Sequence, residues 1–154
     1  MERRITEEQL TKALLLWLEA HGWIIICFDF PQSGTGIALH RNKQSGSSKN
    51  KGSFIPDIVV IKNETVLFFE NKDKFALSDL IKVQHLRENK DYSQSISRLL
   101  TGIKYSKTLF GVGLVHSECA EKKVQLHLGK LDFVVFLHAD TTFQILHGPK
   151  ELFA

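Results

Sequence analysis

The chain has 154 residues, of which 43% are hydrophobic and 24% are charged. This is the composition of one globular domain, and the length is too short to expect two hydrophobic cores. The net charge of +3 permits a nucleic-acid partner but does not establish one. No apolar run is long enough to cross a membrane, and the N-terminus lacks the apolar core of a secretion signal. We therefore expect a cytoplasmic protein with no membrane partner.

The first predicted element is a helix that begins after Thr6. Thr6 can cap the helix, Gln9 stands three positions later as in a capping box, and the helix should end near Ala20. Its apolar stripe consists of Leu10, Leu14, Trp17 and Leu18. Glu7 falls on this same stripe, whereas Glu8 turns away from it. A carboxylate on an apolar stripe suggests a chemical role, although an acid in the first turn is also favoured by the helix dipole alone.

The next segments alternate between strands and breaks. Residues 23–28 are β-branched and aromatic and predict a strand. Residues 40–52 contain four cations, no acid and no apolar anchor, which is typical of a basic surface loop. Two further strands are predicted at 58–61 and 66–69, joined by a turn at 62–65.

The remaining elements alternate in the same way. We expect helices at 77–86 and 92–100, and strands at 108–115, 124–128, 133–137 and 143–146. This order predicts an α/β or α+β class, with a central mixed β-sheet flanked by helices in a single domain covering 1–154. Cys27 and Cys119 lie far apart in or beside apolar segments, and we expect both to be buried free thiols.

Three polar residues mark the ends of the predicted hairpin. Asp57 begins its first strand, and Glu70 and Lys72 end its second. Antiparallel pairing places the start of one strand beside the end of the other, and residues two apart on a strand share a face. The three side chains are therefore predicted to converge.

Two carboxylates and an ammonium group are suited to phosphodiester hydrolysis. Mg²⁺ is bound through a few carboxylates and keeps positions for water and a substrate phosphate. A neighbouring lysine can orient the attacking water or stabilise developing charge. Glu7 is the best candidate for a further acid, and Glu8 is the alternative, because a small error in helix phase would exchange them.

The sequence here resembles a known family. The runs Ile55-Pro56-Asp57 and Glu70-Asn71-Lys72, each adjoining an apolar strand, are similar to the motif of the PD-(D/E)XK nuclease superfamily, which includes type II restriction endonucleases and archaeal Holliday junction resolvases. The similarity covers roughly residues 5–86. It includes the early helix with its acid, and the Ser33-Gly34 segment that precedes the Pro-Asp pair. Asn71 departs from the apolar residue usual at its position and should point away from the site.

The resemblance implies a restriction-endonuclease-like core and Mg²⁺-dependent DNA cleavage, with Mn²⁺ as a substitute. By this resemblance Asp57, Glu70, Glu7 and the Asn71 carbonyl would bind the metal, and Lys72 would be the catalytic lysine. Gln84 could match a glutamine that recurs on the helix after the lysine.

Several interpretations stay open on the sequence alone. The leading one is a type II restriction endonuclease that cuts double-stranded DNA as a homodimer. The alternatives are a nuclease for branched DNA such as a Holliday junction resolvase, a non-catalytic DNA-binding subunit with a nuclease fold, and a coincidental salt-bridged hairpin. The candidate DNA-binding residues are Ser33, Arg41, Lys43, Lys49, Lys51 and Gln84.

Overall fold

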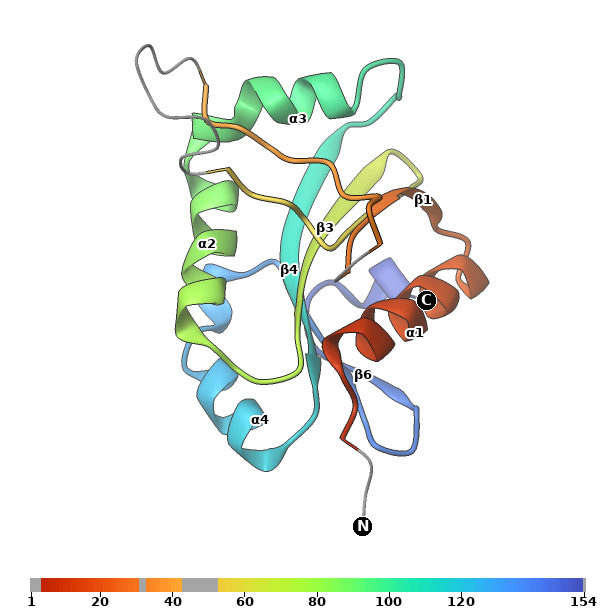
Figure 1. The fold of residues 1–154 in the computed structure, drawn as a ribbon, viewed down its shortest axis with the longest axis vertical. Helices are drawn as coiled ribbons and strands as arrows, with labels where there is room; N and C mark the ends of the chain where they lie inside the picture. Colours follow the sequence, from red (N-terminus) through yellow and green to blue (C-terminus); the bar gives the residue numbers. More distant parts are fainter. Residues whose placement is uncertain (1–3, 31–32, 43–52, 154) are drawn as a thin grey trace.

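In a computed structural model, which describes residues 4–30, 33–42 and 53–153, the chain forms one six-stranded sheet. The strands are β1 (Ile24–Phe28), β2 (Ile58–Lys62), β3 (Thr65–Lys72), β4 (Lys107–Val115), β5 (Phe133–Leu137) and β6 (Phe143–His147). They lie side by side in sequence order (Figure 1). The pairs β3–β4 and β4–β5 are parallel, and the other three pairs are antiparallel. The predicted mixed sheet of an α+β protein is therefore confirmed.

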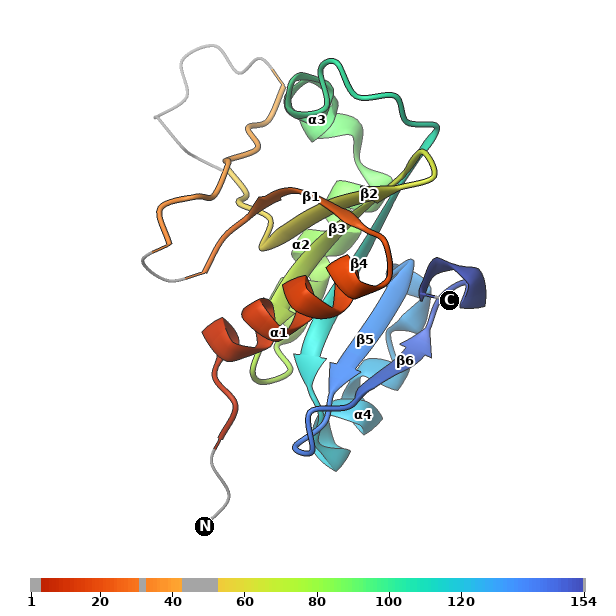
Figure 2. The same cartoon turned by 90° about the vertical axis from the view of Figure 1, so that its right-hand side faces the viewer.

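Helices cover both faces of the sheet. They are α1 (Glu7–Ala20), α2 (Leu77–Glu88), α3 (Ser93–Leu99) and α4 (Glu118–Gln125), with short 3₁₀ turns at Lys90–Tyr92, Leu128–Lys130 and Lys150–Phe153. Helix α1 packs on one face, and α2 and α4 pack on the other (Figure 2). In the described part of the chain, no helix is long and apolar enough to cross a membrane.

Strand β3 lies in the middle of the sheet and is buried on both faces. Val66 and Phe68 belong to the core beneath α2 and α4, whereas Leu67 and Phe69 belong to the core beneath α1. This alternation follows from the two-residue period of a strand. It extends to the polar end of β3, so Glu70 and Lys72 continue the α2 side and Asn71 continues the α1 side.

The capping box predicted for the first helix is present. The Gln9 backbone N–H donates to Thr6 Oγ1 over 3.1 Å, and the Thr6 N–H donates to Gln9 Oε1 over 2.9 Å. The apolar stripe is buried as expected, with Leu10, Leu14 and Leu18 fully inaccessible. The cap fixes the first turn of α1, which carries Glu7.

A two-residue turn sets the register of the β2–β3 hairpin. Asn63 and Glu64 have φ of 49° and 63°, the left-handed conformation that a type I′ hairpin turn requires. The resulting register pairs Ile58 with Phe69, and the Asp57 N–H donates to the Phe69 carbonyl over 2.9 Å. The hairpin is therefore confirmed, and it brings Asp57 beside the end of β3.

Two expectations are wrong in the C-terminal half of the chain. The predicted strand at 124–128 is the end of α4 followed by a 3₁₀ turn. The helix is favoured because Ser117 caps it by accepting from the Ala120 N–H over 3.0 Å, and because the buried residues Ala120 and Val124 are four apart. Cys119 is exposed for the same reason, since it falls on the outer side of α4. Cys27 is buried as predicted, and burial raises the pKa of its thiol to about 11.

Candidate active site

The carboxyl groups of Asp57 and Glu70 meet where β2 begins and β3 ends. Asp57 Oδ2 accepts a hydrogen bond from the Asn71 N–H over 2.7 Å, so the side chain continues the ladder where backbone pairing has stopped. Asp57 and Glu70 are both buried, and their carboxyl groups are hydrogen-bonded to each other. The hairpin thus places two acids in one enclosed spot.

Burial raises the pKa of both carboxyl groups well above the ordinary range for acids. The charge of Asp57 raises the pKa of Glu70 further, whereas the Asn71 N–H opposes the rise at Asp57 by stabilising its ionised form. Two carboxyl groups can hydrogen-bond to each other only when one of them is protonated, so the pair shares one proton. Such a pair has a strong affinity for positive charge.

Lys72 supplies a positive charge beside this pair. Its Nζ lies 3.7 Å from Glu7 Oε1, so the acid on the apolar stripe of α1 reaches the site. Glu8 instead lies 3.8 Å from the amine of Lys12 on the outer side of α1. Partial burial by itself lowers the pKa of Lys72, but the nearby acids outweigh it and the net pKa is raised. The amine therefore carries its proton in this arrangement.

Asp79 is a further acid of the site that the sequence analysis did not single out. It is buried in the first turn of α2, and its charge acts on Glu7, Glu70 and Lys72. An acid in the first turn of a helix is common because the helix dipole favours it, so the sequence around Asp79 gives no sign of a site. Its burial could be known only once α2 was placed over the end of β3.

Asn71 lies between Glu70 and Lys72 but faces the opposite side of the sheet, as expected. It is fully buried, and its Nδ2 donates to Thr11 Oγ1 over 3.1 Å. The Thr11 hydroxyl in turn donates to the Glu7 carbonyl over 2.9 Å. A chain of two hydrogen bonds therefore ties the end of β3 to the turn of α1 that carries Glu7.

Gly113 of β4 makes room for this link. A Cβ at Gly113 would stand 2.5 Å from Asn71 Oδ1 and 2.6 Å from a methyl group of Leu14. Any side chain there would push α1 away from the sheet. Close packing at this point therefore sets the position of Glu7.

The candidate donor set for a metal consists of two carboxylates and a peptide group. The N–H and carbonyl of one strand residue point to the same edge, so the Asn71 carbonyl faces the Asp57 side of β3. The carboxylate of Glu7 pairs with Lys72, and across the described residues no three His, Cys, Asp or Glu side chains form a group that could hold a metal ion. One or two carboxylates are nevertheless the usual protein contribution at a Mg²⁺ site.

The three predicted DNA-binding residues that the structure describes come from three separate segments. Ser33 lies in the loop after β1, where its hydroxyl donates to Asp29 Oδ1 over 3.3 Å and accepts from the Phe30 N–H over 3.2 Å. Gln84 is half-buried on α2. Arg41 is exposed, and its guanidinium donates to the Tyr92 hydroxyl. The other three, Lys43, Lys49 and Lys51, lie outside the described residues.

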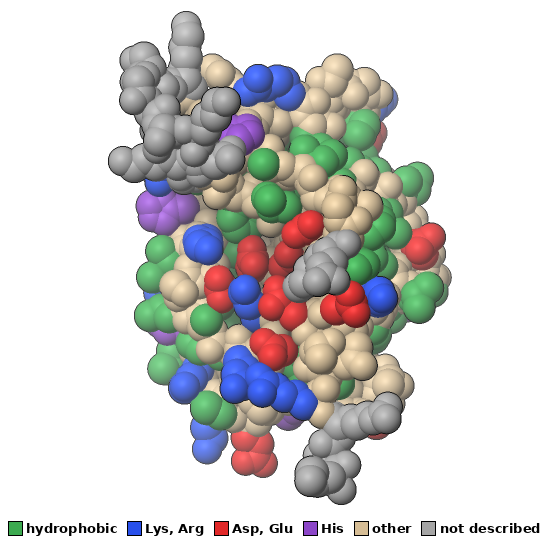
Figure 3. Space-filling view, in the orientation of Figure 1, with side chains coloured by type: hydrophobic (Ala, Val, Ile, Leu, Met, Phe, Trp, Pro, Cys, Tyr) green, Lys and Arg blue, Asp and Glu red, His purple; other side chains and the backbone are tan. Residues whose placement is uncertain are grey.

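One face of the molecule is rich in charge. Figure 3 shows acidic side chains gathered near the centre of one face, with Lys and Arg side chains around them. One hollow, of about 420 Å³, includes Arg4, Lys74 and Lys123 in its lining, and Asp73 and Lys74 directly follow Lys72 in the chain. A second hollow includes Arg41, Lys82 and His85. Apart from Arg41, these basic residues did not stand out in the sequence, because they are scattered over four segments.

No protein-family model, curated protein or solved structure matches the chain.

Proposed function

We propose that this protein is a Mg²⁺-dependent nuclease of the PD-(D/E)XK type, which hydrolyses phosphodiester bonds in DNA. The observation that carries the proposal is the buried pair of Asp57 and Glu70 beside Lys72, at the joined ends of two hairpin strands. The motif, its place on the sheet and the protonation of its residues all agree with this chemistry.

The donor set fits Mg²⁺. Two enclosed carboxyl groups that share a proton would lose it to solvent when a divalent cation binds, since the cation offsets their mutual repulsion. Asp57, Glu70 and the Asn71 carbonyl would hold the ion, and Mn²⁺ would serve in its place. When bound, the ion supplies Lewis acidity toward the phosphate and lowers the pKa of a coordinated water.

The residues of the chain do the remaining work. Lys72, kept charged by the surrounding acids, donates hydrogen bonds to the attacking water or to a phosphate oxygen as negative charge develops. Glu7 fixes the amine of Lys72 from the side of α1. Glu7 is also the acid that the motif would add to the metal ligands.

The flanking cations suit a DNA backbone. Lys74 and Lys123 line one hollow together with Arg4, which pairs with Asp73 over 2.9 Å, and Arg41 and Lys82 line the second hollow. Such cations neutralise phosphates without reading bases. One site cuts one strand, so cleavage of both strands would be performed by a homodimer.

The test is cleavage of a supercoiled plasmid, a linear duplex and a four-way junction by the full chain in Mg²⁺, with EDTA as a blank. Cleavage that requires Mg²⁺ and is lost in Asp57→Ala and Lys72→Ala would support the proposal. Cutting of the junction alone would assign a branched-DNA nuclease in place of a restriction enzyme. Binding without cleavage under Mg²⁺ or Mn²⁺, or full activity in both variants, would overturn the nuclease assignment.

A further inference from the structure

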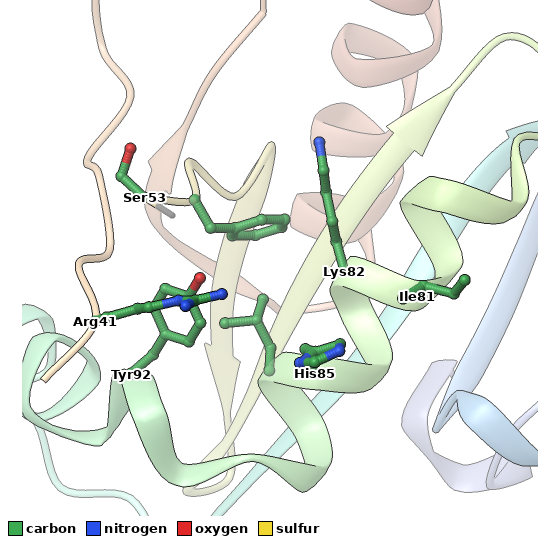
Figure 4. A pocket seen from close by; sticks show the side chains of 8 residues that line it. Arg41, Ser53, Ile81, Lys82, His85 and Tyr92 are labelled. Carbon is green, nitrogen blue, oxygen red and sulfur yellow. The ribbon is translucent and has the colours of Figure 1, made fainter. Parts of the chain in front are cut away.

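A cavity of about 220 Å³ lies between the segment that leads into β2 and helix α2 (Figure 4). The segment that leads into β2 forms one wall through Ser53 and Phe54. Helix α2 and the turn after it form the other walls. The full lining consists of Arg41, Ser53, Phe54, Ile81, Lys82, His85, Leu86 and Tyr92.

The floor of the cavity is apolar, and its rim is cationic. Phe54, Leu86 and Tyr92 are buried and present only small parts of their side chains. Arg41, Lys82 and His85 are exposed, and Arg41 lies along Tyr92 with its guanidinium at the phenol hydroxyl (Figure 4). No Asp or Glu is among the lining residues that the structure describes. An aromatic floor with a positive rim suits a flat ring that carries an anion.

The cavity is lined by residues that are close in sequence to acids of the site. Phe54 lies three residues before Asp57, and Lys82 lies three residues after Asp79. Three residues make about one turn of α2, a rise of about 4.5 Å. Asp79 is close enough for its charge to act on Glu70 and Lys72. Two walls of the cavity therefore belong to the segments that carry Asp57 and Asp79.

We propose that the cavity holds the base of one unstacked nucleotide next to the phosphodiester to be cut, with Lys82 and Arg41 on the adjoining phosphate. This inference rests on the proposed nuclease function and adds a substrate feature to it. The substrate must present a nucleotide free of its stack, as in a single-stranded stretch or a flipped base. A nuclease that reads only a continuous duplex backbone would have no use for an apolar cavity at this place.

The lining distinguishes a nucleotide from a bare phosphate. A phosphate alone would be held by donors, yet four of the eight lining residues are Phe54, Ile81, Leu86 and Tyr92. The volume is below the roughly 300 Å³ at which pockets for drug-sized ligands begin, so it suits one ring system. Both parts of a nucleotide are thus matched, the ring by the floor and the phosphate by the rim.

The experiment measures binding without metal, so that it does not depend on cleavage. The full chain in EDTA is titrated against two labelled eight-residue DNA strands, one of thymidine and one of abasic units with the same number of phosphates. Fluorescence anisotropy gives each Kd. The thymidine strand should bind about tenfold more tightly, the effect of one base–aromatic contact.

Two variants and a control identify the cavity as the cause. Ile81→Trp fills the cavity from an exposed position of α2. It should weaken binding of the thymidine strand to the level of the abasic strand and leave the abasic strand unchanged. Lys82→Ala should weaken both strands about equally, because it removes a phosphate contact. Lys122→Ala removes an exposed lysine of α4 that is outside the cavity lining. It should change neither the Kd for each strand nor the ratio of the two Kd values by more than about twofold.

Equal affinity of the wild type for both strands would overturn the inference, as would a base preference that survives Ile81→Trp. The abasic strand reports phosphate binding in every variant. A misfolded variant is therefore recognised because it no longer binds the abasic strand. If the base preference is found but Mg²⁺ produces no cleavage, the nuclease assignment fails and the nucleotide site stands. If cleavage occurs without base preference, the reverse holds.

Discussion

Two groups of polar residues lie at the same edge of the sheet, where the parallel strands β3, β4 and β5 end. The group at the end of β3 contains Asp57 and Glu70, whose buried carboxyl groups repel each other unless they share a proton. The group after β4 and β5 contains His116 and His138, whose rings stack with centroids 3.9 Å apart. Both groups are polar and near the sheet edge, but their surroundings differ.

The histidine group is satisfied by its own neighbours. His116 Nε2 lies 3.3 Å from Glu121 Oε1, and His138 Nε2 lies 2.6 Å from Gln144 Oε1. The buried carboxyl groups of Asp57 and Glu70 cannot both ionise at low cost, because burial and mutual repulsion disfavour the charged forms. A positive charge beside them would therefore stabilise the ionised pair. The difference indicates that polar residues at a strand end are not in themselves a site. Unbalanced buried charge is the better guide to one.

The largest effect should come from Lys72→Ala, which removes the amine at the end of β3. We expect cleavage of plasmid DNA in Mg²⁺ to fall about 100-fold or more, the contribution of a positioned proton donor or acceptor. His138→Ala, from the other group, should leave the rate within about twofold. Comparable losses in the two variants, measured as initial rates, would remove the contrast between the groups.

Thr11→Val tests the link between β3 and α1. The substitution leaves the buried Asn71 Nδ2 without its partner, so the free energy of unfolding should fall by about 1–3 kcal/mol. Cleavage should fall about tenfold, because Glu7 and Lys72 lose their fixed separation.

Asn71→Leu is the matched variant for this link. It removes the amide whose Oδ1 has no hydrogen-bond partner within the described structure, so it should cost less stability than Thr11→Val while lowering cleavage to a similar degree. The free energy of unfolding of the Thr11→Val/Asn71→Leu double variant should be only slightly lower than that of Asn71→Leu alone. Urea unfolding of the four proteins measures this cycle, and additive losses would show that the link does not act as a unit.

Glu70→Gln should stabilise the metal-free protein above neutral pH. Because the folded-state pKa of Glu70 is raised, the unfolded chain ionises first, and the free energy of unfolding falls as pH rises above about 4. The loss is about 1.4 kcal/mol for each unit by which the pKa is raised. Glutamine cannot ionise and should escape this loss, so the Tm advantage of the variant in EDTA should grow from pH 5 to pH 8.

Mg²⁺ should reverse the Tm order of the wild type and Glu70→Gln that is expected in EDTA. The ion binds the folded wild type and raises its Tm, whereas the variant has lost a ligand and should respond little. A constant Tm difference across pH in EDTA would contradict the view that burial and mutual repulsion disfavour ionisation of the two carboxyl groups.

Ser117→Ala should have the smallest effect. It tests α4, which carries none of the proposed catalytic residues. Loss of the cap on α4 should lower the free energy of unfolding by about 1 kcal/mol, with no change in cleavage rate beyond about twofold. Thermal unfolding and plasmid cleavage measured on one preparation would test both parts. A large loss of cleavage would mean that α4 also belongs to the active site.

Local patterns determined much of this protein. The capping box at Thr6 and Gln9, the two-residue turn at Asn63 and Glu64, and the alternation along β3 act over a few residues. They are therefore legible in the sequence, and with them came the convergence of Asp57 with the end of β3. Residues 124–128 were mispredicted because their apolar side chains also suit a strand, and only the cap at Ser117 and the contact with the sheet favoured the helix.

Only the tertiary structure decided what surrounds these residues. Asp79 entered the site because the first turn of α2 lies beside the end of β3, and Asn71 reached Thr11 because α1 packs close at Gly113. The cavity likewise joins Arg41, Phe54, Lys82 and Tyr92, which come from separate segments. Burial and electrostatic coupling are properties of packed elements, and no spacing along the chain encodes them. The sequence by itself determined which residues could do chemistry, and packing decided their charge and their partners.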